Sequence, residues 1–358
     1  MLLTYSSLIA VGVVTWGGSS EISGRTHQSR TAIMRNRHEK RVPALRCPNL
    51  RATPDLSSLP AAKAGDMAFR IFCTPELSQH RSADHELLTA RARFHLRHAR
   101  WQVVPTPSGD VQSYVYEPDG TPHGTVMLVH GWTSEAAFMT AFIEPLRRSG
   151  LRVVAFDFPA HGLSAGRRTN LADCARAMLA VCDHYGPIDA VVAHSFGGFV
   201  SLLVAEGGPP LGHSHSIGRF VLIACPNTLS EVTRGFGRRL NLGPASQRAY
   251  ERHLERVGHR AVSTFSAAEL LRGIDAPVTI MHGRADDEVG FHNAEEIAAA
   301  YPAARLVAFD GLGHRNVLFA PPVFRAVMGE LAPPRRTSAK SVPRAVQSSR
   351  GQEMKASA

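Results

Sequence analysis

Short runs of apolar residues alternate with amphipathic stretches over most of the chain, beginning near residue 100. The apolar runs predict six strands, at Thr125–His130, Leu151–Asp157, Ile188–His194, Phe220–Cys225, Pro277–His282 and Arg305–Phe309. The stretches between them predict helices near Ala136–Ser149, Leu171–Tyr185, Phe199–Glu206, Ala294–Tyr301 and Pro322–Leu331. Strands that are apolar along their whole length are covered on both faces. The pattern therefore predicts an α/β fold with a mostly parallel, doubly wound sheet.

Two further elements precede this alternation. Trp101–Pro105 and Val111–Glu117 flank a turn of Ser, Gly and Asp at positions 108–110, which predicts a β-hairpin. Glu86–Trp101 carries apolar residues at helical spacing and predicts a helix. Within the later alternation, Pro145 lies inside the helix predicted over Ala136–Ser149 and should kink it, since proline cannot donate the helical hydrogen bond.

One long segment interrupts the strand pattern. Residues 226–272 contain no strand signal but include a helical stretch near Ser246–Val257. An insertion of this size beside the carboxyl edge of a sheet predicts a short helical cap over a pocket. Its arginines, Arg234, Arg238 and Arg239, have two interpretations, a solvated face or contacts to an anionic head group.

The two ends of the chain differ in composition from its middle. Residues 1–66 and 333–358 are polar and basic, so we expect both to be disordered and the folded domain to cover residues 67–332. An apolar run within residues 1–18 is too short to span a bilayer and lacks a clear signal-peptide pattern. Export or membrane association through this run is the alternative to a cytoplasmic location. A start of translation at Met67 would explain the unusual composition before it.

The net charge of +10 comes from the two ends of the chain. Residues 1–66 hold nine Lys or Arg against four Asp or Glu, residues 333–358 hold six against one, and the middle holds 25 of each sign. The predicted domain carries no excess positive charge, which argues against a nucleic-acid partner. The five cysteines form no C-x-x-C pair, and His213 and His215 have no clear third ligand, so we expect neither disulfides nor a metal site. Reduced cysteines fit a cytoplasmic protein.

The strongest candidate for chemistry is Ser195, which directly follows a predicted strand and precedes a predicted helix. A serine on a sharp strand-to-helix turn is exposed to solvent, provided that small residues lie two positions before and after it. Ala193 and Gly197 meet this requirement, although the usual signature has glycine at the first of these positions. The alternative is that Ser195 only caps the helix.

A serine hydroxyl needs a base and an acid that orients the base. Two later predicted strands are each followed by a suitable group, Asp286 after Pro277–His282 and His314 after Arg305–Phe309. The chain order Ser195, Asp286, His314 is the order of an α/β-hydrolase triad. Two neighbours of Asp286, Asp287 and Glu288, compete for the acidic role.

An oxyanion hole requires backbone N–H groups aimed at the developing negative charge. The N–H of Phe196, which follows Ser195, is the first expected donor. The second is the N–H of Trp132, because Gly131 lets the backbone turn toward the nucleophile after the strand Thr125–His130. We expect the remaining motif side chains to shape turns or line the pocket; these are His130, His161, His194, His282 and the turn-stabilising Asp157.

Four motifs together resemble an α/β-hydrolase-fold serine hydrolase of the esterase, lysophospholipase and monoacylglycerol-lipase-like branch. They are VMLVHGW, DFPAHGLSAG, AHSFGG, and HGRADDEV with GLGH, all within residues 100–332. The resemblance implies hydrolysis of a carboxylic ester or related acyl bond of a small or lipid-like substrate, through an acyl-enzyme and without a cofactor or metal. The alternatives are an acyltransferase, a cofactor-free perhydrolase, a C–C hydrolase, or an inactive ligand-binding member of the fold. Substrate and oligomeric state are not predicted.

Overall fold

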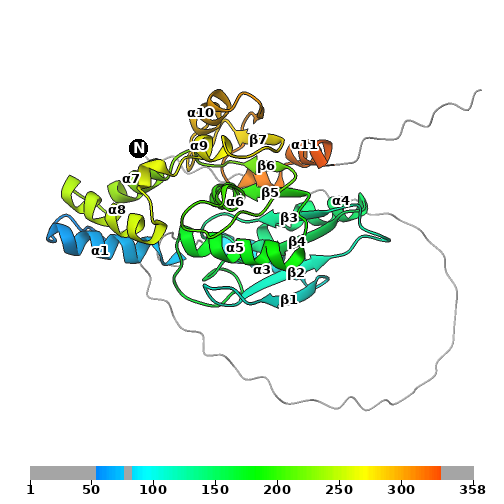
Figure 1. Cartoon of the computed structure of the whole chain (residues 1–358), viewed down its shortest axis with the longest axis horizontal. Helices are drawn as coiled ribbons and strands as arrows, with labels where there is room; N and C mark the ends of the chain where they lie inside the picture. The colour runs from blue at the N-terminus through cyan, green and yellow to red at the C-terminus, as the bar shows by residue number, and fades with distance from the viewer. Residues whose placement is uncertain (1–53, 76–82, 332–358) are drawn as a thin grey trace, which may run out of the picture. The chain divides into compact units, whose positions relative to one another are not determined.

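The computed structural model describes residues 54–75 and 83–331 (Figure 1). The disorder expected for residues 1–53 and 333–358 therefore falls outside the described part. An eight-stranded sheet forms the centre, with strand order β1-β2-β4-β3-β5-β6-β7-β8. Its strands are β1 (Arg100–Val104), β2 (Val111–Tyr116), β3 (Thr125–Val129), β4 (Arg152–Phe156), β5 (Ala190–His194), β6 (Phe220–Ile223), β7 (Val278–Gly283) and β8 (Arg305–Phe309). The β1–β2 and β2–β4 pairs are antiparallel, and the six strands β3 to β8 are parallel to one another.

The sheet separates two apolar cores, as expected for a doubly wound fold. Along β3, Met127 and Val129 point into one core, while Val126 and Leu128 point into the other. The first core is covered by α5 (Leu171–Tyr185), α6 (Phe196–Glu206), α9 (Ala267–Leu271) and α10 (His292–Ala300). The second is covered by η1 (Ala136–Phe142), α4 (Ile143–Arg148), η3 (Asn316–Phe319) and α11 (Pro321–Leu331). The predicted fold and its six parallel strands are confirmed.

Two of the predicted helices differ from expectation. The helix predicted over Ala136–Ser149 is a 3₁₀ segment, η1, followed by the short helix α4, rather than one kinked helix. Pro145 lies in the first turn of α4, where no intrahelical N–H bond is needed. The helix predicted over Glu86–Trp101 is α3 (Ala83–Leu96) and ends five residues early. Trp101 belongs instead to β1, where it pairs with Tyr114 and donates its indole N–H to the Leu96 carbonyl at 2.9 Å.

The cap, residues 226–272, contains more helix than expected. The stretch expected near Ser246–Val257 is α8 (Pro244–Gly258), but α7 (Leu229–Arg239) precedes it and was not predicted. The Thr228 hydroxyl caps α7 by accepting the N–H of Glu231 at 3.2 Å. In Figure 1, α7 and α8 lie beyond one end of α5, on the same side of the molecule as α1.

A helix also forms where the sequence predicts disorder. The helix α1 (Ala61–Phe72) begins ahead of residue 67, the expected start of the domain, and Leu56 before it is buried. Small residues explain this, since Ala64, Gly65 and Ala68 let α1 approach α8 closely and are themselves buried. In the described part of the chain, no helix has the length and apolar character needed to cross a membrane.

Candidate active site

Ser195 occupies the turn between β5 and α6, as the sequence predicts. Its φ of 52° lies in the left-handed region, which is strained for a residue other than glycine. A Cβ atom at Gly197 would lie 2.5 Å from the His130 carbonyl oxygen, so this position requires glycine. Ala193, at the position where the usual signature has glycine, is buried in β5 between Val129 and Leu222. The turn holds the Ser195 side chain at the carboxyl edge of the sheet.

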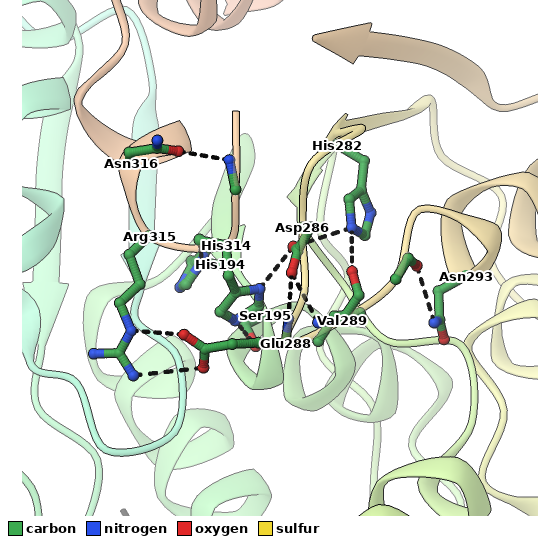
Figure 2. Close-up of polar contacts among 12 residues, drawn as sticks. His194, Ser195, His282, Asp286, Glu288, Val289, Asn293, His314, Arg315 and Asn316 are labelled. Carbon is green, nitrogen blue, oxygen red and sulfur yellow. Dashed lines mark hydrogen bonds and ion pairs between the residues drawn. The ribbon is translucent and has the colours of Figure 1, made fainter. Parts of the chain in front are cut away.

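His314 and Asp286 lie within hydrogen-bond distance of each other, and His314 reaches Ser195 (Figure 2). The His314 Nε2 atom is 3.0 Å from the Ser195 hydroxyl oxygen, and its Nδ1 atom is 2.8 Å from the Asp286 carboxylate. Nδ1 faces an acceptor and therefore carries the proton, which leaves Nε2 free to accept one. The structure thus brings together the three side chains that sequence analysis selected from three loops.

The surroundings of Asp286 distinguish it from its acidic neighbours. One carboxylate oxygen accepts the N–H groups of Glu288 at 3.0 Å and Val289 at 2.8 Å. Burial would raise the pKa of Asp286, but the hydrogen bonds from His282 and His314 outweigh it and hold this pKa well below its usual range. Glu288 is instead paired with Arg315 at 2.8 Å, and Asp287 is exposed. Asp286 is therefore the carboxylate that is buried, ionised and in contact with the imidazole.

His282 contributes more than sequence analysis expected. Its Nε2 atom lies 3.2 Å from the Asp286 carboxylate and 2.8 Å from the Val289 carbonyl oxygen, and its side chain has no solvent exposure (Figure 2). Both neighbours are acceptors, so Nε2 carries the proton and His282 donates to Asp286. The sequence signal for this role is the position of His282, near the end of β7 and four residues before Asp286.

The two expected oxyanion donors lie beside Ser195. Phe196 is the first residue of α6, where a backbone N–H has no intrahelical acceptor. Gly131 brings the loop before Trp132 so close that a Cβ atom there would lie 3.2 Å from the Ser195 Cβ atom. The rings of Trp132 and Phe196 pack edge to face with centroids 5.1 Å apart, and both residues line the same cavity as Ser195 and His314.

The other motif side chains stabilise turns around this site. His130 receives the N–H of Phe158 and bonds the Gly131 carbonyl, while His161 receives the N–H of Thr133. His194 bonds the His314 backbone carbonyl at 2.8 Å, which connects β5 to the loop that carries His314. Burial lowers the pKa of His130 to about 4 and that of His194 to about 3, so both side chains are neutral near pH 7.

Asp157 and the surface histidines have contacts of their own. The Asp157 carboxylate accepts the Ala136 N–H, the Leu163 N–H and the Tyr114 hydroxyl, which confirms its expected turn-stabilising role. His213 and His215 both bond the Asp183 carboxylate, each at 3.0 Å. Across residues 54–75 and 83–331, no group of three or more His, Cys, Asp and Glu side chains is arranged to hold a metal ion.

A cavity of about 480 Å³ opens in front of Ser195. Its wall on the cap side is mostly apolar, and this wall includes Phe72, Leu229, Val232, Phe236 and Leu254. The exposed arginines Arg238 and Arg239 also line it. Phe72 was not among the residues predicted to line the pocket. Its signal was the four-residue spacing of Ala64, Ala68 and Phe72 along one helix face.

Comparisons with known proteins find similar sequences and similar folds. The sequence model of the alpha/beta hydrolase family matches residues 126–327. The chain is 28% identical over 141 residues to a monoacylglycerol lipase of Mycolicibacterium smegmatis, covering 34% of this chain and 50% of that protein. It is 36% identical over 107 residues to methylesterase 9 of Arabidopsis thaliana, covering 28% of this chain and 41% of that protein. The chain thus aligns with half or less of the length of these curated relatives.

Solved structures show the same fold at low sequence identity. Est1E from Butyrivibrio proteoclasticus, in a structure with ferulic acid bound, has a TM-score of 0.53 and 19% identity, covering 64% of this chain and 97% of that one. A membrane phospholipase A described as a bacterial virulence factor has a TM-score of 0.50 and 16% identity, covering 68% and 90%.

Proposed function

The chain belongs to the alpha/beta hydrolase family, as its motifs predicted, and on that premise we propose that it is a serine hydrolase. In this proposal it cleaves a carboxylic ester or a related acyl bond of a small or lipid-like molecule through an acyl-enzyme. The observation that carries the proposal is the continuous hydrogen-bonded chain from Ser195 through His314 to Asp286 on the wall of a largely apolar cavity.

The acylation step follows from the proton positions. His314 Nε2 takes the proton of the Ser195 hydroxyl as its oxygen attacks the substrate carbonyl carbon. The resulting imidazolium is stabilised by the ionised Asp286 carboxylate at Nδ1. The same Nε2 proton then passes to the leaving alcohol as the carbon–oxygen bond breaks. The three residues of such a triad act as a unit, and loss of the nucleophile or the base lowers kcat by about 10⁶-fold.

The oxyanion forms next to two backbone N–H groups in this mechanism. The amides of Phe196 and Trp132 are assigned as its donors, and each such donor contributes about 10²- to 10³-fold in rate. Water then attacks the acyl-enzyme carbonyl and gives its proton to His314, and His314 passes this proton to the Ser195 oxygen as the ester bond breaks and the acid leaves. Every step uses side chains and amides of this chain.

The lining of the cavity supports an ester with an apolar part. Phe72, Leu229 and Phe236 can remove apolar substrate surface from water at about 25 cal/mol per Å². The names of the curated relatives, a monoacylglycerol lipase and a methylesterase, agree with ester substrates of this kind.

The test is hydrolysis of p-nitrophenyl butyrate by the full chain and two variants. Ser195→Ala should lower kcat by roughly 10⁵- to 10⁶-fold, because the nucleophile is lost. Ser201→Ala is the matched control, since Ser201 is buried on the same helix and bonds the Gly197 carbonyl without lining the cavity. Retention of most hydrolysis by Ser195→Ala would contradict the proposal. Added methanol should leave the free acid as the main product, whereas a methyl ester as main product would indicate acyl transfer.

A further inference from the structure

The ring of Phe72 lies where three parts of the molecule meet. Phe72 is the last residue of α1 and lines the cavity in front of Ser195. Its ring stacks on Trp132 of the loop after β3, with centroids 5.9 Å apart. It also packs edge to face against Phe236 of α7 at 5.0 Å and Tyr250 of α8 at 5.6 Å. A residue far from the catalytic motifs in sequence thus contacts both the expected oxyanion loop and the cap.

The helix that carries Phe72 is held in place at both ends. Before α1, the Leu56 N–H donates to the Leu240 carbonyl at the end of α7, at 3.1 Å. After α1, the Cys73 carbonyl accepts the Thr169 N–H at 2.8 Å. One bond ties α1 to the cap and the other ties it to a loop of the α/β core, so the position of Phe72 is fixed relative to both.

The middle of α1 packs closely against α8. A Cβ atom at Gly65 would lie 2.5 Å from the Ala249 Cβ atom and 2.8 Å from the Tyr250 backbone nitrogen, so the helices meet almost backbone to backbone. Figure 1 shows α1 lying alongside α8, and α7 is a neighbour of α8. The wall of the cavity is therefore built from the cap and from a helix that precedes the whole sheet in sequence.

We propose that α1 serves as a third cap helix and that Phe72 is a specificity-determining residue, which limits the length of the apolar group that fits in front of Ser195. This inference rests on the proposed function and adds the residue that selects among ester substrates. Removing the ring opens the cavity on the cap side, whereas a larger ring closes it. One methylene in an apolar pocket changes selectivity by about 10- to 200-fold, so a whole ring is a strong determinant.

Phe69 provides a matched control on the same helix. Its ring stacks on His253 of α8 with centroids 5.2 Å apart, but Phe69 does not line the cavity. Phe69→Ala and Phe72→Ala both remove an aromatic contact between α1 and α8. Only the second changes the space available to substrate, so the pair separates loss of helix packing from a change in the cavity.

The experiment measures the ratio of kcat/KM for p-nitrophenyl decanoate to that for p-nitrophenyl butyrate, in the full chain. Phe72→Ala should raise this ratio by about tenfold or more, and Phe72→Trp should lower it. Phe69→Ala should leave the ratio within about twofold of the unmodified chain, which is smaller than the effect of one methylene. Phe72→Leu replaces Phe72→Ala if the latter does not fold, with a smaller rise expected. Equal ratios in the Phe72 and Phe69 variants would overturn the inference.

A binding measurement keeps the two proposals separate. Calorimetric titration of decanoate and butyrate into Ser195→Ala, with and without Phe72→Ala, needs no catalysis. A gain in decanoate affinity relative to butyrate on removal of the ring supports the role of Phe72, even if the chain hydrolyses no ester. Hydrolysis that depends on Ser195 without any effect of Phe72 on either measurement would leave the proposed function intact and refute this inference.

Discussion

The carboxyl edge of the sheet and the cap above it place their residues in different ways. At the edge, Ser195, Asp286 and His314 each follow directly after a strand or its turn, so backbone pairing of β5, β7 and β8 determines where they lie. In the cap wall, Phe72 and Phe236 come from helices about 160 residues apart, and packing between helices, rather than strand pairing, brings them together.

The two regions therefore have different structural requirements. The edge needs bond distances near 3 Å, such as those from His314 to its two partners, and parallel strands supply such rigid supports. The cap wall needs only a cavity of suitable shape, which helices can provide with many sequences. We therefore expect substitutions at the edge to change rates, and substitutions in the cap wall to change substrate preference and stability.

After the loss of Ser195 itself, the largest expected effect is at Asp286. Asp286→Asn should lower kcat for p-nitrophenyl butyrate by about 10⁴-fold, because the amide no longer stabilises the imidazolium and favours the wrong tautomer of His314. Asp287→Asn alters an exposed neighbouring carboxylate and should change kcat by less than about tenfold, the effect of only 1.4 kcal/mol. Comparable losses in the two variants would contradict the assignment of Asp286 as the carboxylate that supports His314.

The next largest effect is a loss of protein stability at acidic pH, which comes from two buried histidines at the carboxyl edge of the sheet. His130 and His194 are buried with pKa values lowered to about 4 and about 3, while the unfolded chain titrates near 6.5. Between pH 6.5 and 4 the unfolded state binds protons that the native state does not, so stability falls as the pH is lowered. The free energy of unfolding should decrease by about 1.4 kcal/mol per pH unit for each histidine.

A histidine substitution separates this contribution from other acid effects. In urea denaturation at several pH values, His130→Gln should reduce the slope between pH 6 and 4.5 by about 1.4 kcal/mol per pH unit. His98→Gln, at an exposed position, should leave the slope unchanged. An unaltered slope in His130→Gln would show that this buried imidazole does not govern the acid response.

The packing of α1 on α8, which supports the cap wall, is tested most directly at Gly65. Alanine there places a methyl group against Ala249 and the Tyr250 backbone, and we expect the free energy of unfolding to fall by about 1–3 kcal/mol. Gly329→Ala in α11 is the control, because a Cβ atom there meets no atom within 4 Å. Helix propensity should make that variant more stable by up to about 1 kcal/mol. A gain of stability in both variants would mean that α1 does not pack closely on α8.

The same contrast explains how much was predictable from the sequence. The strands and the positions of Ser195, Asp286 and His314 were predictable because each strand is a local apolar run and each group follows one directly. His282 is part of a predicted motif, but its hydrogen bond to Asp286 depends on the turn geometry after β7. A pattern of residue types does not encode such a geometry.

The cap wall was less predictable for a physical reason. The helix α1 has small residues on its buried face, and alanine and glycine give a weak apolar signal even where they allow close helix packing. The first turns of α7 are rich in polar residues, so its apolar face was not recognised. The packing of Phe72 on Phe236 depends on where both helices lie in space, which local pattern does not specify.

The most direct test of the central claim is to locate the nucleophile chemically. The full chain is incubated with a fluorophosphonate, digested, and analysed by peptide mass spectrometry. We predict a single phosphonylated residue, Ser195, with labelling that falls by about 10³-fold or more in His314→Ala, because the hydroxyl loses its base. Labelling of another residue, or equal labelling rates with and without His314, would contradict the account.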